Sequence, residues 1–583
     1  MSDCRHSTPL RRETRTSLLV ATLALPLIAA GASLAAGGET PGHAQADSAR
    51  REAPRAAARP APEAERSAMW IRLADKVADK LVDKVDAQSA RKVSPSDTPL
   101  TERALARRAL RRRAIDGSIV DARDLPIDPA RVAALRATGA EIRVESRWLN
   151  AVSVLATPEE LRAIARLPFV SAIHPVRASR GEKPELELPF GAAGEGAGEG
   201  GVAELDYGAA RDQLVQSGVT AMHARGFHGE GIVIGVLDTG FNRVHEAFHS
   251  AQHPLEVLAE WDFIDNDANT GIEQGNDPQQ HRHGTWILGT LAAYLPGQVV
   301  GAAYQAKFVL AKTEVVATET QVEEDFYVAG LEFIEAQGAD IATSSLGYID
   351  WYTPEDLDGL TAVTTIAVNT ATSNGLICLT AAGNSGNDGD PATQHLIAPA
   401  DALEVLTCGA VDVSGTIAGF SSDGPTADGR VKPEVLARGV ATATVASTNP
   451  TGVSALSGTS LSTPIVAGVA ALVLEARGEF GVTEMRNALC TTASDFVSTG
   501  TTDPLFARGY GIVSAIRAAG SGRSAADLNL DGSVDAADLT ILLGSWGPCV
   551  EPELSLGACA GDINASGATD AEDLAALLAA WGA

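Results

Sequence analysis

Ser460 has the sequence surroundings of a nucleophile. It follows a run of small residues and precedes an apolar stretch rich in Ala and Gly at 465–474. That stretch predicts a buried helix, and Pro464 fits its first turn, where N–H groups lack partners. A hydroxyl at the N-terminus of such a helix lies beside free N–H groups and the positive end of the helix dipole, which favours nucleophilic chemistry. A serine that only caps the helix is the alternative interpretation.

An acid and a base precede this serine in the chain. Residues 231–240 form a continuous apolar run that ends in Asp238, Thr239 and Gly240, which predicts a buried parallel strand. Asp238 would then stand at the carboxyl end of a strand, where open α/β sheets place their active sites, although an Asp before Gly also occurs in simple turns. His283 is the candidate base. The order acid, histidine, serine argues against α/β hydrolases, in which the serine comes first.

Several motifs resemble those of the subtilisin-like serine peptidases. G-T-S-x-S-x-P at 458–464 is similar to the nucleophile motif of that family, D-T-G at 238–240 to its acid motif, and H-G-T at 283–285 to its histidine motif. A-A-G-N at 381–384 resembles a further segment. Trp286 departs from the family pattern, which usually has His at that place.

The resemblance implies an α/β fold, with a mostly parallel sheet and helices on both faces, and peptide hydrolysis through an acyl-enzyme without a catalytic cofactor. Ser460 would attack the carbonyl, His283 would move the proton, and Asp238 would orient the imidazolium; Asn384 and the Ser460 N–H would hold the oxyanion. A polypeptide substrate would pair with the backbone of three residues: Ser345, Leu346 and Gly347. The alternative is a catalytically silent adhesion or scaffold protein on a peptidase fold.

Composition limits the other possibilities. The chain has 583 residues, 45% of them hydrophobic, and a net charge of −29. Residues 1–180 carry 30 Lys and Arg against 21 Asp and Glu, whereas the remainder carries 15 against 53. This acidic remainder argues against nucleic-acid binding. Cys378 and Cys408 lie in apolar runs and predict buried thiols, whereas Cys549 and Cys559 could close a small loop in an oxidising compartment.

The N-terminal third is predicted to contain several separate segments. Basic residues followed by an apolar run indicate a signal peptide at 1–46 and a secreted or extracytoplasmic protein, in the periplasm or at the cell surface. An uncleaved anchor is the alternative and would be its only contact with a membrane. The other predicted segments are a linker or disordered region at 47–116, a small α+β propeptide at 117–180, a flexible linker at 181–204 and the peptidase domain at 205–520. Within the propeptide we expect helices at 129–136 and 158–165 and strands at 141–144, 151–155 and 170–173.

An acidic stretch borders the expected substrate groove. It comprises Glu314, Glu319, Glu323, Glu324 and Asp325. A solvated acidic face is the first interpretation, and a preference for basic substrates is the alternative.

The C-terminal residues 524–583 contain a repeat. The sequence from Asp527 to Asp538 recurs 35 residues later, and each copy continues into a Leu-rich helix. Oxygen side chains at the first, third and fifth positions, Gly at the sixth and a carboxylate at the twelfth are typical of a calcium-binding EF-hand loop. The repeats resemble dockerin modules, which implies a small all-α unit with a cohesin-like or cell-surface partner; acidic turns are the alternative. The predicted Ca²⁺ ligands are Asp527, Asn529, Asp531, Ser533, Asp535, Asp538, Asp562, Asn564, Ser566, Asp570 and Asp573. The two helices are expected to pack through Leu539, Leu542, Leu543 and Trp546 against Leu574, Leu577, Leu578 and Trp581.

Overall fold

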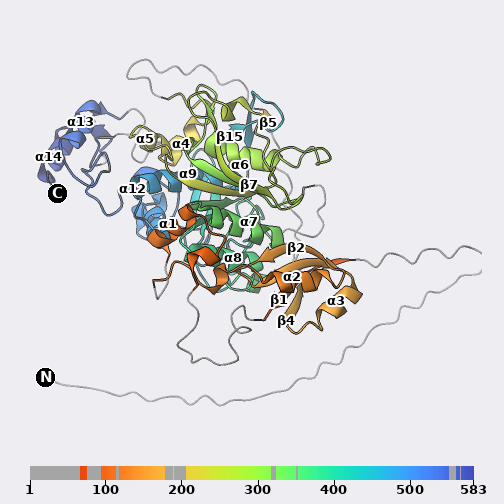
Figure 1. Ribbon diagram of the computed structural model, residues 1–583. Coiled ribbons are helices and arrows are strands. Elements are labelled where there is room, and N and C mark those ends of the chain that lie inside the picture. The colour runs from red at the N-terminus through yellow and green to blue at the C-terminus, as the bar shows by residue number, and fades with distance from the viewer. Residues whose placement is uncertain are drawn as a thin grey trace, which may run out of the picture. The chain divides into compact units, whose positions relative to one another are not determined.

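The computed structural model describes most of the chain after the predicted signal (Figure 1). The described residues are 66–74, 93–112, 117–176, 188–189, 205–316, 324–348, 352–549, 560–564 and 566–582. The predicted signal peptide, most of the predicted linker at 181–204, and residues Glu319, Glu323 and Cys559 lie outside them.

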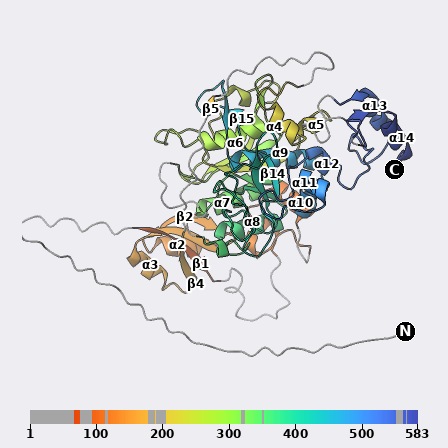
Figure 2. The same ribbon diagram turned by 180° about the vertical axis from the view of Figure 1, so that it is seen from behind.

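A seven-stranded parallel sheet forms the centre of the larger part (Figures 1 and 2). Its strand order is β14-β13-β12-β11-β6-β10-β7. After β10 the chain crosses from one side of β6 to the other, so the switch point lies between β6 and β11, where sheets of this type place their sites. The strands are β6 (Val233–Asp238), β7 (Glu256–Asp262), β10 (Lys307–Lys312), β11 (Ile341–Ser344), β12 (Ile377–Ala381), β13 (Leu406–Val411) and β14 (Val435–Arg438).

Helices cover both faces of this sheet. Ile234 and Val236 of β6 pack in one core cluster with helices α6 (Arg282–Ala292) and α9 (Thr459–Ala476). The alternate residues Val233 and Leu237 pack in a second cluster with α7 (Glu324–Gln337) and α8 (Val363–Ser373). This alternation is the ordinary result of strand geometry, and the inner strands β6, β12 and β13 are buried along their whole length because both faces are covered. The predicted α/β fold with helices on both faces is confirmed.

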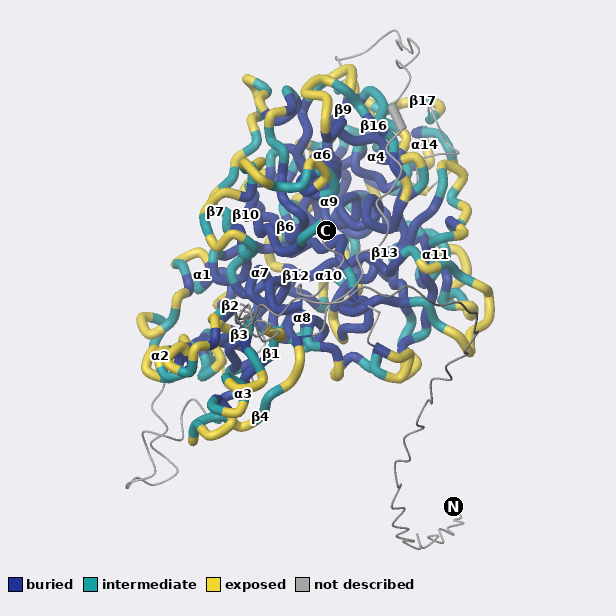
Figure 3. Tube along the Cα trace, turned by 90° about the vertical axis from the view of Figure 1, so that its right-hand side faces the viewer, coloured by how far each residue is buried: buried dark blue, intermediate teal, exposed yellow. Residues whose placement is uncertain are grey.

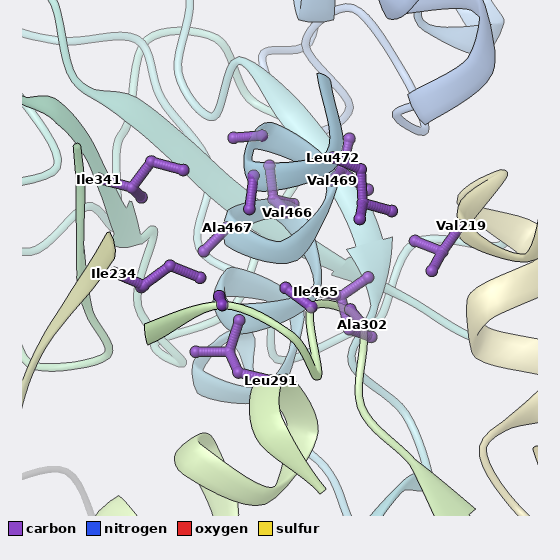
Figure 4. Packing of buried hydrophobic residues seen from close by; sticks show 14 of the residues in the cluster. Val219, Ile234, Leu291, Ala302, Ile341, Ile465, Val466, Ala467, Val469 and Leu472 are labelled. Carbon is purple, nitrogen blue, oxygen red and sulfur yellow. The ribbon is translucent and has the colours of Figure 1, made fainter. Parts of the chain in front are cut away.

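Helix α9 is the central helix of the first cluster (Figures 3 and 4). Among the described residues it alone is long and apolar enough to cross a membrane, with a mean hydropathy of 1.5, but 89% of it is buried inside the protein. Its small residues allow close packing, because a Cβ on Gly468 would lie 2.4 Å from the side chain of Ala302. The helix is therefore the core helix that the sequence predicts.

An antiparallel sheet and three helices precede the part of the chain that contains the parallel sheet. We call residues 66–74, 93–112 and 117–176 the N-terminal unit. Its strand order is β2-β3-β1-β4, and all three helices begin at a side chain that caps them, Thr101, Asp128 and Thr157. The helices and strands predicted at 117–180 are all present. The elements are β1 (Ser67–Leu73), α1 (Glu102–Arg111), α2 (Pro129–Arg136), β2 (Glu141–Ser146), β3 (Ala151–Ala156), α3 (Pro158–Ile164) and β4 (Val170–Pro175).

The prediction of a linker or disordered region over 47–116 is wrong for two segments. β1 lies between β3 and β4, and its residue Ser67 pairs with Ala156, far along the chain, so no local pattern indicates the pairing. α1 carries several arginines, which favoured the solvated interpretation. The structure buries Arg107 and Arg108 against α7, where both pair with Glu335.

The C-terminal repeats form two short helices, α13 (Ala536–Gly544) and α14 (Ala571–Ala579), and a small antiparallel pair, β17 (Gly547–Pro548) and β18 (Ala568–Thr569). Leu542 and Leu577 are fully buried in a small core that also includes Leu539 and Leu574. The prediction that Leu543, Trp546, Leu578 and Trp581 also pack between the two helices is wrong. Because α13 ends at Gly544 and α14 at Ala579, the tryptophans lie beyond the helices. The exposed residues are Leu543, Trp546, Leu578 and Trp581.

Shorter elements complete the described chain. A small sheet of order β15-β16-β5 contains the strand that leads into α9. The elements are β5 (Leu188–Pro189), α4 (Arg211–Gln216), α5 (Val219–His223), β8 (Tyr294–Leu295), β9 (Val299–Val300), β15 (Thr442–Val445), β16 (Val453–Leu456), α10 (Val482–Thr491), α11 (Ser494–Thr499) and α12 (Ala515–Ala519), with short 3-10 turns at Pro95–Asp97, Ala122–Asp124, Glu246–Phe248 and Pro354–Asp356.

Candidate active site

Asp238 and His283 lie side by side at the carboxyl edge of the parallel sheet. Asp238 is the last residue of β6 and is fully buried, whereas the His283 side chain is 22% exposed near the start of α6. Nδ1 of His283 is 2.8 Å from Oδ1 of Asp238. The backbone N–H and the hydroxyl of Thr239 donate to the same oxygen at 2.7 and 3.2 Å. These contacts fix the carboxylate, which in turn orients the imidazole ring.

The close approach of α6 to β6 requires a glycine after the histidine. A Cβ on Gly284 would lie 2.2 Å from the carbonyl oxygen of Gly240 and 3.1 Å from Asp238. The N–H of Gly284 also donates to Oγ1 of Thr239 at 3.2 Å. The D-T-G and H-G-T motifs are therefore in direct contact. Gly284 faces the D-T-G segment, and Gly240 faces the segment that carries His283.

Ser460 lies at the start of α9 and is almost fully buried. α9 begins at Thr459, so Pro464 lies in the second turn and not, as predicted, in the first. A residue at this place would normally donate its N–H to the carbonyl of Ser460, which proline cannot do. Oγ of Ser345 donates to that carbonyl at 2.9 Å. Ser345 thus replaces the missing helical hydrogen bond and joins the end of β11 to the Ser460 turn.

Asn384 follows β12 and is oriented by the residue before Ser460. Its Oδ1 accepts the backbone N–H of Thr459 at 2.9 Å and the hydroxyl of Thr459 at 3.0 Å. Thr459 is not among the predicted site residues, although its position in the G-T-S motif was a usable signal. The Asn384 amide is therefore held against the N-terminus of the helix that carries Ser460.

The segment expected to bind substrate begins directly after β11. Ser345 and Leu346 are buried, and a Cβ on Gly347 would lie 2.0 Å from the Ile397 side chain, so only glycine fits there. Trp286, which departs from the family pattern, is buried in α6 with its ring edge-on to His283, at a centroid distance of 6.4 Å. Trp286 therefore packs beside the imidazole ring of His283, and the contact between His283 and Asp238 is kept.

Helix α7 presents buried acidic side chains to the N-terminal unit. Asp325 accepts a hydrogen bond from Arg143 Nε at 3.0 Å, and Glu332 accepts from the backbone N–H groups of Arg147 and Trp148 at 3.1 and 3.2 Å. The predicted solvated face is wrong for Glu324 and Asp325, both of which are fully buried, and for Glu314, which is buried in the preceding loop. Asp325 can be buried because Arg143 of the N-terminal unit supplies the opposite charge.

Glu335 is the most strongly paired of these acids. Oε1 lies 2.7 Å from Arg108 Nε, and a second ion pair joins Glu335 to Arg107. Burial alone would raise the pKa of Glu335, but Arg107 and Arg108, with a smaller contribution from Arg147, lower it to about 2. By contrast, burial raises the pKa of Glu332 because its single arginine partner, Arg147, does not compensate. Glu335 is thus an anion that depends on the arginines of α1.

The two C-terminal loops have the same internal hydrogen bonds. In the first, Asp538 accepts the N–H groups of Leu528, Asn529 and Asp535 at 2.7, 3.1 and 2.8 Å. Asp573 accepts from the corresponding three residues of the second loop at 2.8, 3.1 and 2.8 Å. Burial raises the pKa of Asp527, and the neighbouring carboxylates of Asp538 and Asp531 raise it further. Each loop thus folds around its first and last aspartates, and in the first loop these carboxylates are close enough to repel.

The cysteines that the structure describes are not among the candidate site residues. Cys378, Cys408 and Cys490 are buried free thiols, and burial raises the pKa of Cys378 to about 12. Cys549 is disulfide-bonded, whereas Cys559 lies outside the described residues.

Known proteins resemble two parts of this chain. The profile described as the Subtilase family (Peptidase_S8) matches residues 229–512, and that described as the peptidase S8 propeptide domain of Bacteroidota matches residues 68–186. Subtilisin DY of Bacillus licheniformis is 32% identical over 277 residues, which are 47% of this chain and 88% of the relative. Subtilisin E of Bacillus subtilis (strain 168) is 31% identical over 277 residues, and the chain spans 63% of its length. Among solved structures, fervidolysin of Fervidobacterium pennivorans, described as a keratinolytic enzyme related to subtilisin, is 22% identical with a TM-score of 0.49, covering 68% of this chain and 60% of that one.

Proposed function

Because the chain belongs to the subtilase family, we propose that it is a serine endopeptidase with a catalytic triad of Asp238, His283 and Ser460. The observation that carries the proposal is the 2.8 Å contact between His283 Nδ1 and the buried carboxylate of Asp238 at the edge of the sheet; Ser460 lies in the first turn of α9. Membership of a family establishes a fold but not an activity. The contact between Asp238 and His283 supports the activity, because it is the contact that a catalytic acid and base require.

The proposed mechanism assigns one role to each residue. Ser460 attacks the peptide carbonyl while His283 takes its proton and later delivers it to the leaving amine. Asp238 keeps the imidazole in the required tautomer and orientation through the Nδ1 contact. The Asn384 amide and the Ser460 N–H stabilise the oxyanion, and the hydrogen bonds from Thr459 support this role by fixing the Asn384 side chain. An acyl-enzyme on Ser460 is then hydrolysed by water.

We propose that an extended polypeptide binds along residues 345–347. Backbone pairing of this kind provides affinity largely independent of sequence. The hydrogen bond from Ser345 to the Ser460 carbonyl supports this assignment, because it places the segment directly beside the nucleophile.

We propose that the N-terminal unit is a propeptide that remains attached until the chain is cut within 177–210. The match to a peptidase S8 propeptide profile and the buried contacts with α7 support this proposal. Within the stretch, β5 pairs with β16, the strand that leads into α9, so this part of the chain passes near the proposed nucleophile.

We further propose that the protein is secreted and carries a calcium-dependent tail. The residues that would hold Ca²⁺ are those of the two repeated loops, which begin at Asp527 and Asp562. Their common hydrogen bonds and the raised pKa of Asp527 support the fit, since a cation would relieve the repulsion between neighbouring carboxylates. The exposed Trp546 and Trp581 are available for a cohesin-like or cell-surface partner.

A serine-directed fluorophosphonate tests the proposed activity. The mature protein should be labelled at Ser460 and should digest casein, whereas Ser460→Ala should do neither and should retain the N-terminal unit if processing is autocatalytic. Labelling that persists in Ser460→Ala would refute the nucleophile, and a folded mature protein that takes no label would favour a silent scaffold.

A further inference from the structure

Three side chains outside the proposed triad gather on the loops next to Asn384. We call Asp388, His395 and Asp423 the loop cluster. One possible ligand atom from each residue lies within 4.8 Å of the others. Asp388 and His395 belong to the loop that follows β12 and Asn384, and Asp423 belongs to the segment between β13 and β14. The proposed mechanism does not use these residues.

Asp423 has an unsatisfied oxygen in this cluster. Its side chain is 0% exposed, and Oδ1 lies 2.6 Å from Nδ1 of His395. Oδ2 is buried and has no hydrogen-bond partner. A buried carboxylate oxygen that has lost its hydration without gaining a partner is unfavourable, and buried carboxylates are normally paired or bound to a metal. The unsatisfied oxygen therefore indicates that Asp423 binds a positively charged ligand.

The other two residues are also oriented. The hydroxyl of Thr393 is 3.0 Å from each oxygen of Asp388, and the N–H of Asp390 donates to Oδ1 at 2.9 Å. The backbone N–H of His395 donates to the carbonyl of Asp423 at 3.0 Å, which joins the two segments beside the cluster. Such outer hydrogen bonds are typical of metal-binding carboxylates and histidines, because they hold the ligand atoms in place.

A second acidic group gives a useful contrast. Asp262, Asp267 and Glu273 also bring ligand atoms within 4.8 Å of one another. There, however, Nζ of Lys312 lies 2.6 Å from Oδ2 of Asp262 and is itself buried, so a positive charge is already present. No lysine or arginine is paired with the loop cluster among the described residues.

We propose that Asp388, His395 and Asp423 bind a divalent first-row transition metal of the Zn²⁺ type. One imidazole nitrogen with two carboxylates suits Zn²⁺, whereas Ca²⁺ and Mg²⁺ prefer oxygen ligands alone. The metal would link the loop after Asn384 to the segment before β14, which already meet through a 3.0 Å bond from the Ser385 N–H to Ser422 Oγ. The bound metal therefore braces the loop that carries Asn384. This proposal does not depend on the proposed peptidase activity.

The test uses the full chain with Ser460→Ala, which prevents self-digestion. The protein is freed of metal with a chelator and titrated with Zn²⁺ by calorimetry in the presence of excess Ca²⁺, which occupies oxygen-only sites. The variants are His395→Gln and Asp388→Asn, and the matched control is Asp390→Asn. Asp390 is an exposed carboxylate in the same loop that bonds only to nearby backbone. Because Asp423 is buried and its replacement risks unfolding, the test relies on the two accessible residues.

The parent and the control should each bind one Zn²⁺ more than the two variants. Zn²⁺ should also raise the thermal midpoint of the parent and the control, by mass action, but not that of His395→Gln. Equal Zn²⁺ stoichiometry and affinity in the parent and His395→Gln would overturn the proposal. So would a parent that binds no Zn²⁺ under these conditions.

Discussion

The hydroxyl of Ser345 donates a hydrogen bond to the carbonyl of Ser460, the group to which Pro464 has no N–H to donate. Two segments that are far apart in the sequence are thus joined at the proposed nucleophile. Because the carbonyl is buried, the contact has consequences for stability that can be measured.

We expect Ser345→Ala to lower the free energy of unfolding by about 1–3 kcal/mol, the usual effect of leaving a buried group unsatisfied. Pro464→Ala restores an N–H at that place and should recover most of the loss in the double variant. Thermal and chemical unfolding of all four forms of a double-mutant cycle, in the Ser460→Ala background, measure the coupling. Additive effects of the two substitutions would show that the serine does not replace the helical donor.

Glu335→Gln should strongly destabilise the precursor. The variant leaves Arg107 buried without its anion and leaves Arg108 with Asp124 alone, and breaking a buried pair costs roughly 3–5 kcal/mol. The control is Glu160→Gln, which removes the pair with the exposed Arg66 and should cost at most about 1 kcal/mol. Unfolding of the uncleaved protein is the measurement, and equal losses for the two variants would contradict the prediction.

The same pair predicts a pH dependence at the acidic end. The pKa of Glu335 is lowered from 4.5 to about 2, so its contribution is fully present above 4.5 and is lost as the pH falls toward 2. The precursor should therefore lose stability over this interval, and Glu335→Gln should flatten that part of the profile. Glu332 acts in the opposite direction, because its pKa is raised. Thermal midpoints measured against pH test this, and identical slopes in the two proteins would exclude Glu335 as the cause.

Asn384→Ala should lower kcat by about 10²–10³ with little change in KM, a figure measured in subtilisin, a relative of this chain. Thr459→Val removes only the side-chain donor to Asn384 and keeps the backbone N–H contact, so its effect should be smaller and of the same kind. Steady-state kinetics on a peptide substrate provide both constants. A large rise in KM with unchanged kcat would instead place Asn384 in ground-state binding.

Residues 524–583 should fold only when Ca²⁺ is bound. The described core of this tail is small, with Leu542 and Leu577 at its centre, and so small a unit usually needs a metal. A chelator should abolish the helical circular dichroism of an isolated 524–583 fragment, and Ca²⁺ but not equal Mg²⁺ should restore it. A spectrum that does not change on chelation would mean that the loops are ordinary acidic turns.

Local sequence was sufficient to predict the strands and helices whose formation depends on residues close together in the chain. The continuous apolar run before Asp238 predicts a buried strand, and β6 ends at that residue. The small-residue run after Ser460 predicts a core helix, and α9 is buried over most of its length. The motif order likewise placed Asp238, His283, Asn384 and Ser460 in one proposed site, because each motif combines a residue with the strand end or helix start that positions it.

Tertiary structure alone decided the contacts between distant segments. β1 was not predicted because its stability comes from pairing with β3 and β4, and the arginines of α1 appear solvated until α7 provides Glu335. The same holds for the bond between Ser345 and Ser460 and for the unsatisfied oxygen of Asp423. Local preference determines where a strand or helix begins, but burial and charge pairing depend on which segments the fold brings together.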